Sequence, residues 1–324
     1  MTEKSIVSTD AGALVNPPQF IPLTPSESPA LSACLACVNS PKSRESLLVA
    51  TFIKSISSTA PGDNPPEDKT LDPGEAFGLV KKILKINDLY EKENRIEVIL
   101  LSRNTSDTGL RIRNSIESHG LNISRAAFCG GESPHRYVKD FGVHLFLSSN
   151  IEDVKLAIES NVAAATIMSR SDSSRRESSS DLLKIAFDGD AVIFSDESER
   201  VFQKDGLKAF IDNEVNSKSI LKEGPFKSFL VELNKIQNEF QINECPIRTA
   251  LITARSAPSD KRVIKTLRDW GVRIDESLFL GGMSKNKFLE SFDADIFFDD
   301  QKKHIIDANK RTTSGHVPYG IKNN

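Results

Sequence analysis

Short apolar runs alternate with amphipathic stretches along most of this 324-residue chain. A short apolar run bounded by polar residues indicates a buried strand, whereas apolar residues spaced three and four apart indicate a helix with one buried face. In the first half the pattern predicts strands at 47–53, 96–101, 143–147 and 163–168, helices at 76–90, 110–119 and 151–158, and a loop over 54–74.

The second half continues the alternation. The pattern predicts strands at 185–187, 248–253, 296–298 and 313–317, with helices at 199–213, 226–236, 263–270 and 305–308. Strands that alternate with helices favour a parallel, doubly wound, Rossmann-like α/β sheet.

Several landmarks recur at a constant offset, which predicts an internal repeat. The pairs, each 151 residues apart, are 128–131 with 279–282, Gly120 with Gly271, and Leu145 with Ile296. Because a repeat decides the number of domains, we expect two tandem copies of one α/β unit.

The repeat and the composition together predict the domain organisation. Residues 1–42 are rich in Ser, Thr and Pro, and we expect a disordered tail there. The first copy is predicted over 43–168, a Ser-rich linker over 169–181, and the second copy over 182–324, with a small helical insertion at about 199–240. The linker segment 175–178 fits either a solvated linker or a phosphorylation site for a basic-directed kinase.

Charge and cysteine content restrict the classes of partner. The net charge is −3, which indicates neither a nucleic-acid nor a membrane partner. No stretch resembles a signal peptide or a membrane helix, so we expect a soluble, cytoplasmic protein. Four cysteines are too few for a disulfide framework. Cys34 and Cys37 form a CxxC motif that fits either two small apolar residues or an isolated zinc or redox site.

Charged residues follow the predicted strands of the second copy only. Asp188-Gly189-Asp190 follows one strand, Thr253 ends the next, Lys285 lies in a later loop, and Asp299-Asp300 ends another strand. Each feature alone is typical of a turn, a cap or a solvated side chain. Ligands of parallel sheets bind at the carboxyl ends of the strands, so together these residues indicate one site, and its carboxylates suit Mg²⁺.

The first copy lacks these charges. Its counterparts are Ser102 for Thr253, Pro134 for Lys285, and Ser148-Ser149 for Asp299-Asp300. A set of purely structural residues would have no reason to differ between the copies in this way. We therefore expect the first copy to be a degenerate unit without a metal site.

The segment Phe187-Asp188-Gly189-Asp190-Ala191-Val192, with Thr253, Lys285 and Asp299-Asp300, resembles the four-motif pattern of the haloacid dehalogenase superfamily. The chain resembles the type I cytosolic 5′-nucleotidases more closely. The likeness extends from about 73 to 321 and departs from the family around 48–72. It is carried by 186–200, 245–249, 253–256, 297–301 and 316–321, and in the first half by 101–104 and 145–149.

The resemblance implies a haloacid-dehalogenase-like fold and Mg²⁺-dependent hydrolysis of nucleoside 5′-monophosphates, AMP and others. Asp188 would form an aspartyl-phosphate, and Asp190 would act first as acid and then as base. Thr253 and Lys285 would bind the phosphoryl oxygens. The implied metal ligands are Asp188, the main chain of Asp190, Asp299 and Asp300.

Other residues are candidates for substrate contact. Arg255 fits a role at the phosphate or an exposed position, and Asp196 fits the entrance of the site or the cap of a helix. We expect Ser102, Arg103 and Asn104 of the first copy to form part of the nucleoside pocket; the alternative is that this copy only buries an apolar face. ADP is a candidate activator by resemblance, and a homo-oligomer is left open.

Two other functions are compatible with parts of the pattern. A glycosyltransferase would use the Asp-x-Asp at 188–190 for a sugar-nucleotide's metal, but it leaves Lys285 and Asp299-Asp300 without a role. A non-catalytic nucleotide-binding protein would bind nucleotide without turnover.

Overall fold

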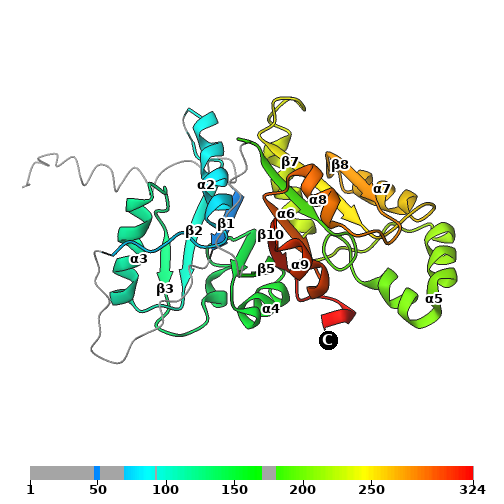
Figure 1. Cartoon of the computed structure of the whole chain (residues 1–324), viewed down its shortest axis with the longest axis horizontal. Coiled ribbons are helices and arrows are strands. Elements are labelled where there is room, and N and C mark those ends of the chain that lie inside the picture. The colour runs from blue at the N-terminus through cyan, green and yellow to red at the C-terminus, as the bar shows by residue number, and fades with distance from the viewer. Residues whose placement is uncertain (1–46, 52–68, 92, 170–179, 324) are drawn as a thin grey trace, which may run out of the picture. The chain divides into compact units, whose positions relative to one another are not determined.

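A computed structural model describes residues 69–91, 93–169 and 180–323, together with the backbone of 47–51. The described strands form one ten-stranded sheet in the order β3-β2-β1-β4-β5-β10-β9-β6-β7-β8 (Figure 1). The tail at 1–42 with its CxxC motif, and most of the predicted loop at 54–74 and of the linker, lie outside the described residues.

The first five strands form one half of the sheet, which we call the first run. All pairs within it are parallel. Its members are β1 (Leu47–Thr51), β2 (Ile96–Ser102), β3 (Ala126–Phe128), β4 (Leu145–Ser148) and β5 (Ala163–Ile167).

The remaining five strands form the second run, which is also parallel throughout. It consists of β6 (Leu183–Phe187), β7 (Ile247–Thr253), β8 (Glu276–Phe279), β9 (Ile296–Asp299) and β10 (Thr313–His316). Its order outward from the joint, β10-β9-β6-β7-β8, matches the first run's β5-β4-β1-β2-β3. The α/β class and the mainly parallel sheet are therefore confirmed.

The two runs meet through one antiparallel pair, β5 with β10, in which Gly315 lies opposite Ile167. A Cβ on Gly315 would come within 2.8 Å of Phe298 and 2.9 Å of Ala165, so this close approach requires glycine. Because the pair is antiparallel, the carboxyl ends of the first run's strands lie at the opposite edge of the sheet from those of the second run.

Helices connect the parallel strands and cover the sheet. Those of the first half are α2 (Phe77–Lys85), the 3₁₀ turn η1 (Ile86–Leu89), α3 (Ser106–Ser118), the 3₁₀ turn η2 (Pro134–Tyr137) and α4 (Ile151–Glu159). Those of the second half are α5 (Glu197–Asn216), α6 (Lys227–Gln237), α7 (Asp260–Asp269), α8 (Asn286–Phe292), α9 (Lys302–Ala308) and η3 (Ile321–Asn323). No helix in the described ranges has the length and apolar content needed to cross a membrane.

Local signals explain where several helices begin and end. The side chain of Thr105 accepts a hydrogen bond from the Thr108 amide, so α3 begins at Ser106, four residues before the predicted start. Asn150 caps α4 in the same way through the amides of Glu152 and Asp153. Gly120 and Gly271 follow α3 and α7 with φ values of 65° and 63°, which is the left-handed C′ position that favours glycine.

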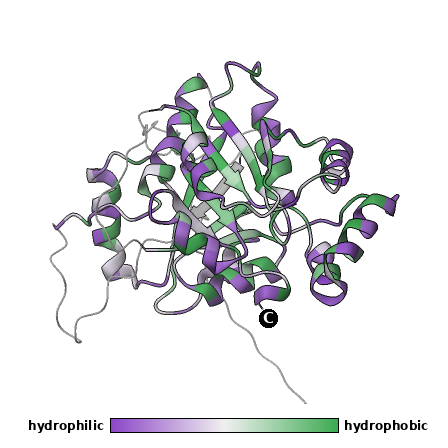
Figure 2. Cartoon of the chain, turned by 45° about the vertical axis from the view of Figure 1, so that its right-hand side comes forward, coloured by the Kyte–Doolittle hydropathy of each residue, from purple (hydrophilic) through white to green (hydrophobic). Residues whose placement is uncertain are grey.

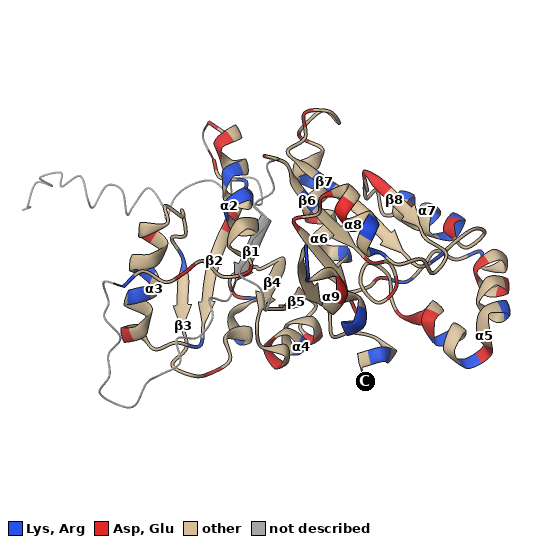
Figure 3. Cartoon of the chain, viewed as in Figure 1, with Lys and Arg blue, Asp and Glu red and all other residues tan. Residues whose placement is uncertain are grey.

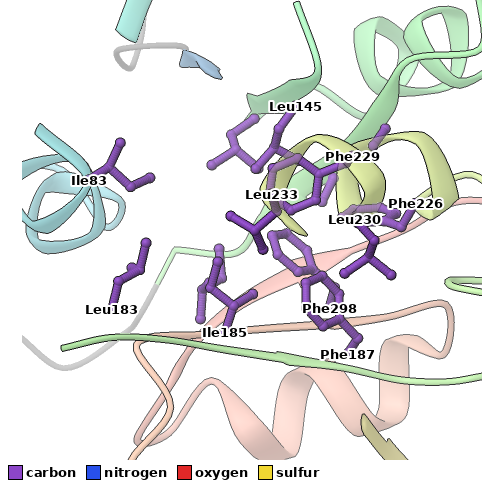
Figure 4. Close-up of a cluster of buried hydrophobic side chains, with 14 of the residues drawn as sticks. Ile83, Leu145, Leu183, Ile185, Phe187, Phe226, Phe229, Leu230, Leu233 and Phe298 are labelled. Carbon is purple, nitrogen blue, oxygen red and sulfur yellow. The ribbon is translucent and has the colours of Figure 1, made fainter. Parts of the chain in front are cut away.

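One hydrophobic cluster contains side chains from both runs. Helix α6 contacts β5, and Phe229 of this helix and Phe226 at its N-cap pack against β6 and β9. The ring centroids of Phe226 and Phe298 are 4.7 Å apart (Figure 4). The central strands are largely hydrophobic, whereas the surrounding helices carry both kinds of residue (Figure 2). The core therefore extends across the β5–β10 joint rather than stopping at it.

Candidate active site

Asp188 lies directly after β6, in a tight loop that contains Gly189. The Asp188 amide donates to the Phe298 carbonyl (2.8 Å), and the Gly189 amide donates to Asp188 Oδ1 (2.7 Å). A Cβ on Gly189 would lie 3.2 Å from Thr253 Oγ1, so a larger residue would press on the end of β7. The loop thus fixes a buried carboxylate at the carboxyl edge of the second run.

Asp188, Asp299 and Asp300 form a buried carboxylate group, which we call the acidic trio. One oxygen from each lies within 4.8 Å of the other two. Burial, with Asp299 nearby, raises the pKa of Asp188 to about 6 despite Lys285, and burial with two acidic neighbours raises the pKa of Asp300 to about 9. Three carboxylates this close are costly to keep ionised without a cation, and their oxygens are the ligands of a hard divalent ion. The trio therefore fits a metal site.

Lys285 joins two members of the trio. Its Nζ lies 2.8 Å from Asp188 Oδ1 and 2.6 Å from Asp299 Oδ2, and its side chain is 4% exposed. Burial works against the charge, but the two carboxylates outweigh it and raise the pKa of Lys285. Lys285 is the residue before α8, and the alternative of a solvated side chain at a helix start is wrong because the side chain points into the site.

Two histidines that are not among the predicted site residues contact the end of β9. His304 Nδ1 lies 3.0 Å from Asp299 Oδ2, and His316 Nε2 lies 3.0 Å from the Asp300 carbonyl oxygen. For Asp299, burial favours the neutral form, but Lys285 and His304 outweigh it and lower its pKa. The signal in the sequence was that His304 lies only four residues after Asp300, on the helix that follows β9.

Thr253 and Asp190 also lie at this edge. Thr253 ends β7, is buried, and its Oγ1 accepts a hydrogen bond from the Arg255 amide (3.3 Å). The Asp190 carboxylate accepts two hydrogen bonds from Arg255, from Nε at 2.8 Å and from Nη2 at 2.6 Å. Its carboxylate is not part of the acidic trio.

The structure decides between the alternatives for Arg255. Its side chain is 2% exposed and bridges Asp190 to Glu214 of α5, with 2.6 Å between Nη1 and Glu214 Oε2. Arg255 is therefore a buried residue beside Asp190 and not a surface arginine. Glu214 escaped sequence analysis because no motif links a helix residue to an arginine far along the chain.

Asp196 lies at the beginning of α5. It forms an ion pair with Arg200 (2.8 Å), and its side chain caps no helix amide. A Cβ on Gly320 would approach Asp196 and Ala191 to 3.1 and 2.9 Å, so Asp196 packs beside the loop that carries Asp190.

The three candidates in the first run are not brought to this site. Ser102 ends β2, which is six strand positions from β6, or roughly 29 Å at the usual spacing of about 4.8 Å. The antiparallel joint also directs the end of β2 to the opposite edge of the sheet. The expectation that Ser102, Arg103 and Asn104 form part of the pocket around Asp188 is therefore wrong within one chain.

Arg103 and Asn104 have other surroundings. Arg103 pairs with the fully buried Asp153 (2.5 Å). Asn104 is buried, and its carbonyl accepts a hydrogen bond from the Gly130 amide at 3.0 Å.

A cavity of about 350 Å³ lies elsewhere, between α2 and the segment before β9. It is lined by Lys82, Asp295 and Arg311 among others and contains no member of the acidic trio. The cavity lies at the amino ends of the second run's strands, whereas the acidic trio lies at their carboxyl ends.

Comparison with known proteins agrees with this geometry. The family model described as 5′-nucleotidase matches residues 63–324. Human cytosolic 5′-nucleotidase 1B is 40% identical over 256 residues, which is 75% of this chain and 42% of that protein, so the chain spans less than half the length of this relative. The matched range contains the acidic trio, Lys285 and Thr253. The chain belongs to the 5′-nucleotidase family.

Proposed function

We propose that this protein is a Mg²⁺-dependent 5′-nucleotidase that hydrolyses nucleoside 5′-monophosphates to nucleoside and phosphate. The observation that carries the proposal is the placement of Lys285 between Asp188 and Asp299, beside a third buried carboxylate. A buried ammonium next to a metal-compatible acidic trio suits a phosphoryl group, which carries negative charge on three oxygens. Membership of the family supports the same reaction.

In the proposed mechanism Asp188 is the nucleophile. One of its carboxylate oxygens attacks phosphorus, the bond from phosphorus to the 5′-oxygen breaks, and an aspartyl-phosphate forms. Asp190 gives a proton to the departing 5′-oxygen. It then takes a proton from the water that attacks phosphorus, so that phosphate leaves and Asp188 is regenerated.

The remaining site residues would stabilise the negative charge of the phosphoryl group. Asp188, the Asp190 carbonyl oxygen, Asp299 and Asp300 would hold Mg²⁺, which when bound would offset the repulsion between the carboxylate nucleophile and the phosphate. Lys285 and Thr253 would bind phosphoryl oxygens and stabilise the charge of the transition state. His304 would keep Asp299 oriented by its hydrogen bond.

We propose further that the fold is haloacid-dehalogenase-like and consists of two copies of one unit, of which the first has lost its chemistry. The matching strand orders and the 151-residue offset support this. Loop contacts support it as well: Cys129 N donates to Ser102 O at 2.8 Å, and Leu280 N donates to Thr253 O at 2.9 Å. Donor and acceptor of the second contact each lie 151 positions after those of the first.

The identity of the nucleotide rests on the resemblance alone. We propose AMP and other ribo- or deoxyribonucleoside monophosphates as substrates, and a cytoplasmic location in line with the name of the human relative. Activation by ADP and assembly into a homo-oligomer stay predictions. The glycosyltransferase alternative gains no support, because it gives Lys285 and the Asp299-Asp300 pair no role.

Phosphate release from a panel of nucleoside monophosphates tests the proposal. We expect release from AMP with Mg²⁺, loss of release after treatment with a chelator, and recovery when Mg²⁺ is added back. The control is thermal unfolding of the chelated protein, which must remain folded at the assay temperature. Binding of AMP without any release would instead favour a non-catalytic protein, and release undiminished by the chelator would remove the metal from the mechanism.

A further inference from the structure

Helix α5 carries a buried carboxylate that the proposed mechanism does not use. The Glu214 side chain is 0% exposed and accepts hydrogen bonds from Arg255 Nη1 (2.6 Å), Arg262 Nη1 (2.9 Å) and Ser198 Oγ (2.7 Å). Two arginines thus face Glu214, while Asp190 takes the other side of Arg255. Arg262 also pairs with Glu197 (3.2 Å), so two arginines and three carboxylates form one network, which we call the Glu214 network.

One end of the Glu214 network is Asp190, the proposed general acid. Arg255 holds the Asp190 carboxylate through Nε and Nη2, which fixes the plane of that carboxylate as only a guanidinium can. Asp190 keeps 20% of its side chain exposed, so without this pair little would restrict its rotation. The orientation of Asp190 therefore depends on the orientation of the Arg255 guanidinium.

Helix α5 in turn fixes Arg255. The helix is interrupted at Gly206 (φ 80°), and Glu214 lies in the part after this kink. Phe210, from the same part, has its ring centroid 5.4 Å from Arg255 Cζ. Figure 3 shows the charged residues of both signs along α5. One short segment of α5 thus supplies both an anion and an aromatic face to the same arginine.

We propose that Glu214 is a positioning residue for the reaction: through Arg255 it sets the orientation in which Asp190 protonates the leaving oxygen. The inference rests on the proposed function, in which Asp190 is the general acid. A positioned acid contributes about 10²- to 10⁴-fold to a rate only while its proton lies within reach of the oxygen that leaves. Loss of Glu214 leaves Arg255 with one fewer partner, so the acid loses its alignment although every reacting group is still present.

A purely structural role for Glu214 predicts something different. Burial of two arginines requires counter-charges, and their loss alone would lower stability and the active fraction. Such a loss reduces the rate with every substrate by the same factor. A misaligned acid, in contrast, reduces the rate most for substrates whose leaving group needs a proton, and least for those whose leaving group is a stable anion.

The test compares two leaving groups on one preparation of Glu214→Gln. AMP releases an alkoxide that needs a proton, whereas p-nitrophenyl phosphate releases a phenolate that leaves as a stable anion. Since kcat/KM includes steps only up to the first irreversible one, it reports the step that Asp190 assists as an acid. We expect kcat/KM for AMP to fall at least about tenfold further than kcat/KM for p-nitrophenyl phosphate.

Two further variants keep the test decisive. Glu214→Asp retains the charge and should lie between wild type and Glu214→Gln in the ratio of the two kcat/KM values; it supplies the ratio if Glu214→Gln does not fold. Asp153→Asn is the matched control, because Asp153 is equally buried and binds an arginine and a serine in the first run. It should leave the ratio unchanged even if the melting temperature falls.

The outcomes separate this inference from the proposed function. Equal losses on both substrates in the Glu214 variants would overturn the positioning role while leaving the nucleotidase assignment intact. A wild-type protein that releases phosphate from neither substrate would overturn the proposed function itself.

Discussion

The two runs of the sheet have the same strand order and similar turns after their strands, but the residues at their strand ends differ in charge. In the second run Asp299 Oδ1 accepts a hydrogen bond from the Gln301 amide (2.7 Å), and in the first run Ser148 Oγ accepts one from the Asn150 amide (3.0 Å). Thr253 and Ser102 likewise accept from the amide two residues on, at 3.3 and 3.2 Å. The turn after each strand requires an acceptor oxygen, whereas only the site requires a charge.

The difference therefore separates what the fold needs from what the chemistry needs. Ser148 and Asp299 are both almost completely buried, so burial does not distinguish them. What distinguishes them is the partner: Asp299 faces the buried ammonium of Lys285, and the first run has Pro134 at the corresponding position.

The largest effect expected in the second run is that of Asp188→Asn. The asparagine keeps the shape of the side chain but removes the nucleophile, so turnover of AMP should fall below detection, as losses of about 10⁶-fold are known for catalytic nucleophiles. Phosphate release and circular dichroism should be measured together. A folded variant with near-normal release would show that another group attacks phosphorus.

A crossed pair of variants sharpens the comparison between the runs. Asp299→Ser retains an acceptor for the Gln301 amide but removes the charge, so we expect the protein to fold with a rate lowered about a hundredfold or more. Ser148→Ala removes the turn acceptor of the first run without touching the site, and should lower stability by about 1 kcal/mol with an unchanged rate. A rate loss in Ser148→Ala would mean that the first run takes part in the chemistry.

A further prediction, which leaves the reaction itself aside, concerns the pH dependence of the stability of the protein stripped of metal. The pKa of Asp300 is raised to about 9 when folded, against about 3.9 for an unfolded aspartate, so the folded state holds a proton that the unfolded state has released between these values. Stability should therefore fall as the pH rises through that window, in contrast to the usual salt-bridged carboxylate.

Melting temperatures from pH 6 to pH 9 measure this effect. The chelated protein should melt several degrees lower at the higher pH, Asp300→Asn should reduce the slope, and Mg²⁺ should reverse it. A melting temperature that stays constant or rises in the chelated protein would contradict a protonated Asp300.

The sequence predicted the long elements and the residues after the second run's strands, because both have strong local signals. Short apolar runs in the sequence predicted the bounds of β2, β7 and β9 to within a few residues. The short strands β3 and β8, at the two ends of the sheet, escaped detection because each has only three or four residues and none of them is buried. Helix α8, with seven residues and no capping side chain, was missed for the same reason.

The errors at the site concern relations between distant parts of the chain. Ser102 and Thr253 look equivalent in sequence, and nothing in the pattern shows that Gly315 pairs antiparallel with Ile167 and so reverses one run. Arg255 was ambiguous because its long side chain suits either surface or interior, and only the presence of Glu214 decides. Local pattern predicts elements, whereas the direction of joining and the pairing of buried charges are fixed by tertiary structure.

The antiparallel contact of β5 with β10 gives the sheet the symmetry of a dimer within one polypeptide. Two identical five-strand subunits that associate through their last strand, related by a two-fold axis, would have this strand order and these directions. Such a dimer carries two equal active sites on opposite edges, neither of which depends on the other. Under the proposed duplication, mutations in one site would leave its twin unchanged, and half of the molecule would be free to acquire a different task.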